Sequence, residues 1–184
     1  LDETRSDPTN GAGSCALYQR DTNGVWSRDK IITDGSQDST GNVGWDIDVD
    51  QNMMVISSTN HCFDKNGTNF VYLAGAVWIW RYDTSKTSWV IEQKITPSIR
   101  LPMDNFGYKV SLSGNTLAVS ATGRNQNSGV VYIFNRPAST PIGTLNSWKE
   151  TTMINPTSYQ PGATFGYDLK IQDSTDSLIA RSPY

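Results

Sequence analysis

The chain has 184 residues, a formal net charge of −3 and 36% hydrophobic residues, a length that suffices for one domain with a real core. The acidic balance and the lack of a basic cluster argue against a nucleic-acid partner. The sequence holds no apolar run near the about 18 residues that a membrane span requires. It also holds no helical apolar period, and its polar residues are turn and strand-edge types, which predicts an all-β fold.

Short apolar runs of strand length follow one another along the chain. The first four cover residues 13–18, 26–32, 44–49 and 54–57. The next four cover residues 75–80, 89–95, 107–112 and 117–120, and the last four cover residues 129–134, 148–154, 166–171 and 178–181. Tight polar turns such as residues 113–115 join neighbouring runs, as in antiparallel hairpins.

The runs repeat in phase. Gly44, Gly107 and Gly166 each precede an aromatic residue and an alternating run, and they lie 63 and 59 residues apart. The same two spacings separate three tryptophans that begin another run, Trp26, Trp89 and Trp148. In-phase repetition of strands at such a period is typical of β-propeller blades.

We name the four strands of each unit A, B, C and D, with A beginning at the glycines. The chain then reads C-D, A-B-C-D, A-B-C-D, A-B, which amounts to three repeats in permuted register, approximately 1–59, 60–122 and 123–184. We treat them as one propeller region, residues 1–184. Residues 1–13 are a polar loop rather than a natural start, so we expect this region to be part of a longer chain.

These residues resemble the FG-GAP repeat family, the blade unit of integrin α-subunit-like propellers. Phe106-Gly107 and Phe165-Gly166 carry the Phe-Gly pair, and residues 129–134 match the Gly-x-Val-Tyr-x-Phe strand. Val43-Gly44 departs from the pattern, and the Gly-Ala-Pro position is degenerate in all three copies. The resemblance implies a non-enzymatic, extracellular or cell-surface protein that contacts other proteins or matrix through its blade loops.

Members of that family often hold Ca²⁺ in an aspartate-rich A–B loop, where oxygen ligands suit a hard cation. The first two A–B turns here, residues 50–52 and 113–115, are too short to surround an ion. The third turn has Asp173 and Asp176 but no glycine and too few carboxylates. We therefore expect no metal and no cofactor, as in a calcium-free branch of the family.

Three residues are candidates for covalent modification. Asn66 begins an Asn-Gly-Thr sequon in a long polar B–C loop, which predicts N-glycosylation in a secreted protein. Cys15 and Cys62 could form a disulfide between adjacent blades, or could remain buried thiols. A bridge would close 46 intervening residues and would stabilise the fold by roughly 4 kcal/mol in the chain-entropy model.

The sequence offers little material for catalysis, so we expect no enzyme. His61 is the only histidine and reads as a loop residue. Asp46, Asp48 and Asp50 alternate along one strand; paired carboxylates can hydrolyse glycosides, but solvated strand-edge acids without complements in the other repeats are the favoured interpretation. The tryptophans are interpreted as packing between blades. Stacking on sugars through the tryptophans that lie on strands A and C, as in a lectin-like propeller, is the alternative: Trp45, Trp78 and Trp80.

Three repeats are too few to close a ring, which usually takes about four to eight blades. The open ends could be completed by more of the same chain or by other chains, including copies of itself through strand addition. Two copies would give a six-bladed ring, and a non-closing rotation would give a filament. The sequence thus predicts an extracellular structural or adhesion protein with protein partners, and possible partners also include glycans.

Overall fold

A computed structural model describes residues 13–33, 41–141, 144, 146–158, 160–172 and 177–183. These residues form twelve strands and one short helix, α1 (Arg124–Asn127). No helix in these ranges is long and apolar enough to cross a membrane. The strands are β1 (Cys15–Arg20), β2 (Trp26–Ile32), β3 (Val43–Asp50), β4 (Met53–Ser58), β5 (Ala76–Asp83), β6 (Ser88–Ile95), β7 (Phe106–Ser113), β8 (Thr116–Ala121), β9 (Val130–Asn135), β10 (Lys149–Ile154), β11 (Asp168–Gln172) and β12 (Ser177–Arg181).

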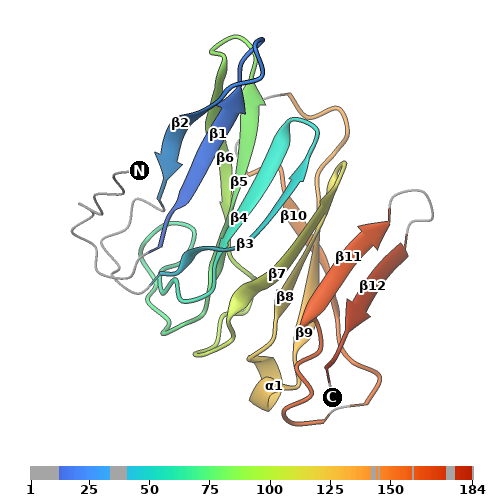
Figure 1. Ribbon diagram of the computed structural model, residues 1–184. Coiled ribbons are helices and arrows are strands. Elements are labelled where there is room, and N and C mark those ends of the chain that lie inside the picture. Colours follow the sequence, from blue (N-terminus) through green and yellow to red (C-terminus); the bar gives the residue numbers. More distant parts are fainter. Residues whose placement is uncertain are drawn as a thin grey trace.

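The strands form two complete antiparallel sheets and two hairpins (Figure 1). The complete sheets are β3-β4-β5-β6 and β7-β8-β9-β10, while β1-β2 and β11-β12 form the hairpins. This confirms the predicted order C-D, A-B-C-D, A-B-C-D, A-B and the all-β, propeller-type fold. Closure of a ring is not seen among the described residues. The predicted repeat limits at 59 and 122 fall just after the B strands β4 and β8, and this division stays a prediction.

The main core lies between the two complete sheets. Strands β4 and β8 are almost wholly buried, in keeping with their continuous apolar sequences. The cluster also takes side chains from β5, β7 and β9, including Val77, Phe106 and Tyr132. Two smaller clusters join the hairpins to the complete sheets: one packs β1-β2 against β3 and β4, and the other packs β11-β12 against β8 and β9. Each sheet therefore buries its apolar faces against the sheets before and after it.

Two glycines explain the repeated motif. Gly75, which opens strand C, has φ +84°, and a Cβ atom on it would lie 2.0 Å from the carbonyl oxygen of Phe106. Phe106 N–H in turn donates to the Ala74 carbonyl (3.0 Å). Gly129 approaches Phe165 in the same way, at 2.2 Å. Only glycine permits both the left-handed conformation and this close approach.

The first repeat keeps the same contact without its phenylalanine. A Cβ on Gly13 would lie 2.4 Å from the Val43 carbonyl oxygen, and the two residues form a parallel bridge. The contact involves main-chain atoms, so Val43 can replace phenylalanine without changing it. We call these three contacts the blade seams.

Candidate functional site

The connections between strands gather at the two ends of the stack. The A–B and C–D turns lie at one end, and the B–C and D–A connections lie at the other, where α1 is found (Figure 1). We call this second end the loop face. It comprises residues 59–75, 96–105, 122–129 and 155–167, with 159 outside the described residues. Segment 59–75 joins β4 to β5, and segment 96–105 joins β6 of one complete sheet to β7 of the other.

Main-chain hydrogen bonds tie these two segments together. Met103 N–H donates to the Tyr72 carbonyl (2.9 Å), and Asn105 N–H donates to the Leu73 carbonyl (3.1 Å). Arg100 adds a side-chain clamp, since its guanidinium donates to the carbonyls of Asn69 and Cys62, both at 2.8 Å. Burial lowers the pKa of this guanidinium. The D–A segment is therefore held rigidly along the B–C loop.

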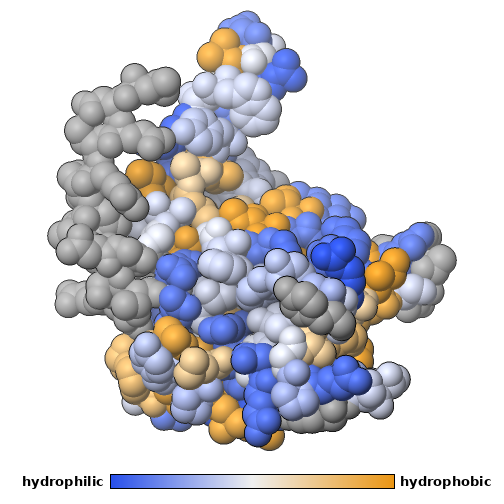
Figure 2. All heavy atoms as spheres, turned by 60° about the horizontal axis from the view of Figure 1, so that its bottom comes forward, coloured by the Kyte–Doolittle hydropathy of each residue, from blue (hydrophilic) through white to orange (hydrophobic). Residues whose placement is uncertain are grey.

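Five large apolar residues project from the paired segments. Each is 45% to 58% exposed: Phe70, Tyr72, Ile99, Leu101 and Met103. Figure 2 looks toward this end and shows hydrophobic side chains at the surface among polar ones. Single exposed apolar residues are ordinary, but several on two segments that are tied together are typical of an interaction site. We call this group the apolar loop patch.

Met103 is unusual within the patch. Its φ is +63°, a left-handed value that a bulky side chain adopts at a cost of about 1 kcal/mol. The next repeat has Gly162 at the corresponding position, with φ +82° and nothing within 4 Å of the place that a Cβ would occupy. The local fold therefore does not call for a side chain there, and Met103 exposes 58% of its surface. Strained, exposed residues of this kind occur at functional sites.

A buried ion pair holds the main chain of the apolar loop patch. Asp104 and Arg124 are both buried and lie 2.8 Å apart. Asp104 also accepts the N–H of Leu101 (2.9 Å), and Arg124 donates to the Ile99 carbonyl (3.3 Å). Burial raises the pKa of the Asp104 carboxyl, although Arg124 acts in the opposite direction. The main chain beneath two patch residues is thus fixed by paired, buried groups.

Asn66 lies exposed in a turn close to the patch in sequence. Gly67 N–H donates to the Asp64 carbonyl (3.0 Å), and the Asp64 carboxylate accepts the N–H groups of Asn66 (3.1 Å) and Thr68 (2.8 Å). These hydrogen bonds lower the pKa of Asp64, the Thr68 bond most strongly. The geometry leaves Asn66 accessible, and its glycosylation stays a prediction.

Cys15 and Cys62 are both buried, in different surroundings. A Cβ on Gly44 would lie 2.7 Å from the Cys15 sulfur, and burial raises the pKa of the Cys15 thiol. The Cys62 sulfur donates to the Asn60 carbonyl (3.3 Å) and accepts from Leu73 N–H (3.4 Å). The disulfide between them stays a prediction.

The acidic residues of β3 correct the sequence interpretation. The carboxylates of Asp46, Asp48 and Asp50 accept the main-chain N–H groups of three residues on β7 and the turn after it, Val110 (2.8 Å), Leu112 (2.8 Å) and Gly114 (2.6 Å). Lysines from later repeats pair with two of them, Lys109 with Asp46 (3.0 Å) and Lys170 with Asp48 (3.2 Å).

The prediction of solvated acids without complements was therefore wrong. The reason is that β3 and β7 are neighbours from different sheets that share no ladder, so side chains supply the acceptors. The sequence did contain a signal: Lys109 and Lys170 stand at the repeat positions of Asp46 and Asp48. We call the three aspartates and their partners the carboxylate comb.

Aromatic residues line the start of the A strands. Trp45, Tyr108 and Tyr167 occupy the same position in successive units, with ring centroids 5.6 Å and 5.4 Å apart. Trp45 Nε1 donates to the Tyr108 carbonyl (3.1 Å), which fixes the indole while it remains 50% exposed. Trp78 and Trp148 are buried, as the packing interpretation predicted, whereas Trp26 and Trp45 are exposed.

Metal and catalytic candidates are sparse in the part of the chain that the structure describes. There, three or more His, Cys, Asp and Glu side chains do not gather in a way that could hold a metal ion. Asp173 and Asp176 lie outside the described residues. His61 is buried, with its ring 5.1 Å from the Trp78 ring and its Nε2 2.7 Å from Lys94 Nζ.

Residues 89–134 match the family model of the FG-GAP repeat. The chain therefore carries an FG-GAP repeat. The match runs from β6 through β7 and β8 to β9 and includes the Phe106-Gly107 pair, in agreement with the resemblance seen in the sequence. No curated protein matches the chain. FG-GAP repeats are typical of extracellular or surface proteins and are typically non-enzymatic.

The FG-GAP repeat includes part of the apolar loop patch. Ile99, Leu101 and Met103 lie on its D–A segment, within the matched residues, while Phe70 and Tyr72 precede the match. The Gly75–Phe106 seam likewise joins Phe106, which lies within the matched residues, to Gly75, which precedes them. The patch is thus built across two blades, and sequence reasoning missed it because exposure depends on which faces the neighbouring loops cover.

Proposed function

We propose that this chain is a non-enzymatic extracellular adhesion module that holds a protein partner against its loop face. The apolar loop patch carries the proposal, because five large side chains are exposed together on two segments that are tied to one another. Exposed apolar side chains that gather on one face are typical of protein contact sites. The compartment and the lack of catalysis are supported by what is typical of FG-GAP repeats.

The chemistry of the patch indicates the chemistry of the partner. It offers two aromatic, two aliphatic and one thioether side chain, so a complementary surface would itself be apolar. Aromatic anchors often supply most of the binding energy, and Met adapts to irregular partners. Since Arg100 and the buried Asp104–Arg124 pair hold the supporting main chain, the patch would lose little conformational freedom on binding.

Binding of the fluorescently labelled chain to cultured eukaryotic cells tests the proposal. We expect saturable binding that is abolished when surface proteins are removed with trypsin, and that falls at least tenfold for a Phe70→Ser, Leu101→Ser double variant. Val25→Ser is the matched control, because Val25 is equally exposed at the opposite end of the molecule. Unchanged binding by the double variant would contradict the proposal.

Met103→Gly separates binding from folding. Relief of the left-handed conformation should stabilise the fold by about 1 kcal/mol, measured by urea unfolding, because glycine accepts this φ freely. Loss of the thioether should weaken partner binding. A variant that is more stable and binds less well supports a functional role for Met103. A variant that binds as well as the parent would show that Met103 does not contact the partner.

A carbohydrate-binding module is the second candidate, favoured by the ladder of Trp45, Tyr108 and Tyr167. The fixed, half-exposed indole of Trp45 offers a flat face of the type on which sugars stack. A glycan array decides between the two candidates. Glycan binding that is lost in Trp45→Ala and kept in the Phe70→Ser, Leu101→Ser variant would favour the lectin role.

N-glycosylation of Asn66 is proposed with the extracellular role. The expected observation is a mass increase on secretion from eukaryotic cells that peptide N-glycosidase removes. The increase should be absent from Asn66→Gln and retained in Thr68→Ser, which preserves the sequon. Secretion of the protein without a glycan on Asn66 would contradict this proposal. The adhesion role would not be affected by that result, because the binding experiment tests it separately.

A further inference from the structure

Two tyrosines from different sheets lie with their rings side by side. Tyr108 is on β7, in the second complete sheet, and Tyr167 directly precedes β11 of the next unit. Their ring centroids are 5.4 Å apart, with an angle of 42° between the ring planes. Within the part of the chain that the structure describes, this is the only contact between two tyrosine rings. The chain thus places two phenols at one contact between successive blades.

The hydroxyl groups of this pair also lie together. Desolvation by burial raises the pKa of Tyr108 most, and its interaction with the Tyr167 side chain raises it further. Because the hydroxyl is the only polar group of a tyrosine side chain, the two hydroxyls are neighbours. The ring carbons next to each hydroxyl, which are the carbons that couple when phenols are oxidised, therefore lie at the same contact.

Contacts between the same two units hold the rings in place. Gly166, which precedes Tyr167, has φ +84°, and a Cβ atom on it would lie 2.6 Å from the Cβ of Ser120. The start of the last A strand is thereby packed closely against β8. Further along this strand, Ile171 N–H donates to Ser111 Oγ on β7 (3.0 Å). The strands that carry the two tyrosines are therefore fixed relative to one another.

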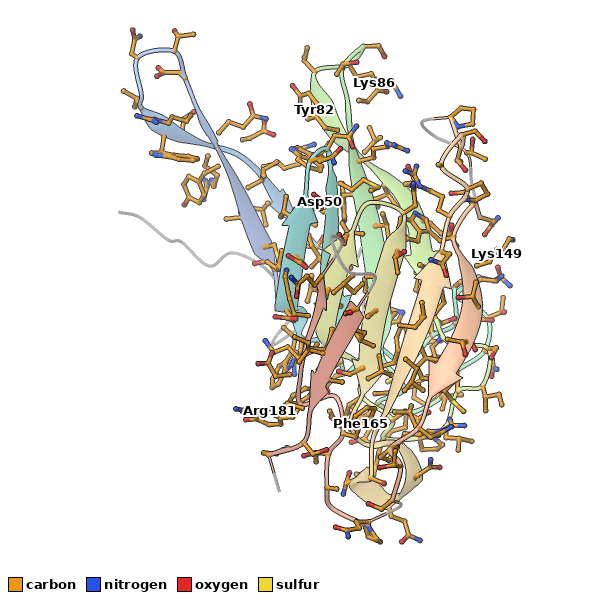
Figure 3. All side chains as sticks on the ribbon, turned by 90° about the vertical axis from the view of Figure 1, so that its right-hand side faces the viewer. Asp50, Tyr82, Lys86, Lys149, Phe165 and Arg181 are labelled. Carbon is orange, nitrogen blue, oxygen red and sulfur yellow. The ribbon has the colours of Figure 1, made fainter. Side chains whose placement is uncertain are left out.

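Both rings reach the surface of the molecule. Tyr167 is 39% exposed and Tyr108 is half-buried. The guanidinium carbon of Arg181 lies 6.0 Å from the centre of the Tyr167 ring. Figure 3 shows Arg181 and Phe165, two residues before Tyr167, at the lower end of the sheets, where α1 also lies. A small diffusible oxidant can therefore reach the pair from the loop-face end.

We propose that Tyr108 and Tyr167 are a site of oxidative cross-linking, at which a dityrosine bond joins two successive blades and stabilises their contact. The oxidant is a haem peroxidase that uses hydrogen peroxide and removes one electron and the hydroxyl proton from each phenol. The two phenoxyl radicals form one carbon–carbon bond between ring carbons next to the hydroxyls. Each ring then transfers the hydrogen on its coupled carbon to its oxygen. The two electrons and two protons break the O–O bond of the peroxide and give two water molecules.

The equivalent contact in the preceding unit cannot form this bond. Trp45 occupies the repeat position of Tyr108 there, and its ring lies 5.6 Å from the Tyr108 ring. Its indole N–H donates to the Tyr108 carbonyl, so this aromatic residue is explained by packing and a hydrogen bond. Packing alone thus requires an aromatic residue at this position, but it does not require two phenols. The cross-link is specific to the contact of β7 with β11.

Mass spectrometry after treatment of the dilute chain with peroxidase and hydrogen peroxide tests for the bond. We expect a single chain that has lost two hydrogen atoms and shows dityrosine fluorescence. The yield should fall at least tenfold in Tyr108→Phe and in Tyr167→Phe, both checked for folding by circular dichroism. Tyr159→Phe is the matched control and should keep the product, because trypsin leaves Tyr159 and Tyr167 on one peptide. A product that survives Tyr108→Phe or Tyr167→Phe overturns the proposal, as does the formation of covalent dimers alone.

Two further measurements distinguish a site built by the fold from random oxidation. Tyr18 and Tyr72 are 51% and 55% exposed, more than Tyr167, so exposure alone would favour reaction at them. In urea that unfolds the chain, the yield of the intramolecular product should fall at least fivefold, because the ring contact is lost. An equal yield in urea overturns the proposal.

The effect of the bond on the fold is measured by thermal unfolding. The purified cross-linked chain should have a midpoint roughly 10 °C above that of the untreated chain, because the bond restricts the unfolded state as a disulfide does. Treated Tyr167→Phe is the control and should keep the midpoint of its untreated form. An unchanged midpoint of the cross-linked chain overturns the proposed stabilisation. The apolar loop patch takes no part in the bond, so the cell-binding experiment tests the adhesion role separately.

Discussion

Two surfaces of the molecule use the same repeat positions: the interface between the two complete sheets and the outer face of the β1-β2 hairpin. The side chains at these positions are buried in the first and exposed in the second. Trp148 directly precedes β10, strand D of one complete sheet, and is 2% exposed, and its Nε1 donates to the buried Glu92 (3.0 Å). Trp26 begins strand D of the hairpin and is 64% exposed. The residue type is the same, but Trp148 packs against the sheet before it, whereas no sheet precedes the β1-β2 hairpin among the described residues. A blade therefore depends on its neighbour for burial of its own apolar face.

The polar side of the interface gives the same lesson. Glu92 lies between Arg81 (3.1 Å) and Arg136 (3.7 Å), and Arg136 stacks over the Trp148 ring at 5.6 Å. Glu92 and Arg81 come from one sheet, and Arg136 and Trp148 come from the next. Such a buried ionic group is costly to break, so it favours one order and register of adjacent sheets.

The largest effect is expected at a blade seam. Gly75→Ala would place a Cβ 2.0 Å from the Phe106 carbonyl oxygen, at φ +84°, so the two complete sheets must separate. We expect a loss of about 4 kcal/mol in the free energy of unfolding, measured with urea. Gly67→Ala is the control, with φ +74° and nothing within 4 Å of the added Cβ, and should cost about 1 kcal/mol. Similar losses for both would show that the close approach is unimportant.

The two tryptophans come next. Trp148→Ala removes a large buried side chain and takes away the indole N–H that Glu92 accepts, which should cost about 3 to 5 kcal/mol. Trp26→Ala removes an exposed side chain and should change stability by about 0.5 kcal/mol or less. Thermal unfolding followed by circular dichroism measures both. A large loss for Trp26→Ala would mean that the hairpin buries its outer face in solution.

Substitutions in the carboxylate comb should give a smaller difference in stability between an inner and an outer position. Asp48→Ala leaves the Leu112 N–H without its acceptor and removes the ion pair with Lys170, at a cost of about 1 to 3 kcal/mol. Asp168→Ala removes an exposed carboxylate from β11 and should change the free energy of unfolding by no more than about 0.5 kcal/mol. Amide exchange at Leu112 reports the lost hydrogen bond directly. An unchanged exchange rate at Leu112 would show that Asp48 does not accept its N–H in solution.

The smallest effect concerns the turn at Asn66. Hydrogen bonds from main-chain N–H groups hold the pKa of Asp64 below its ordinary value. A depressed carboxyl pKa stabilises the turn above the unfolded pKa, and this stabilisation is lost as the pH falls through the folded value. Acid should therefore loosen this turn, seen as a shift of the Thr68 amide resonance. Asp64→Asn should remove that titration, and a Thr68 resonance that still titrates would point to another group.

The sequence predicted the strands and their order because the same series of apolar runs recurs along the chain, and each recurrence corresponds to one sheet. The runs that begin at Gly44, Gly107 and Gly166 and those that begin at Trp26, Trp89 and Trp148 recur at the same spacings, and together with the runs between them they predicted the order of the strands. What it did not predict are properties that arise between units. The carboxylate comb joins β3 to β7 across two sheets, and the exposure of Trp45 depends on which residues lie opposite. The left-handed Met103 follows from a turn geometry that its own residue type disfavours.

The blade seams have a consequence for how such chains can vary. Each seam is formed by main-chain atoms of a glycine and of the residue that opens the next A strand, as in the contacts of Gly13 with Val43 and of Gly75 with Phe106. Side-chain identity at the opening residue does not enter the contact. A blade could therefore be duplicated, deleted or exchanged within a gene while the junction remains intact. The number of blades is then free to change in evolution, while the loops diverge toward different partners.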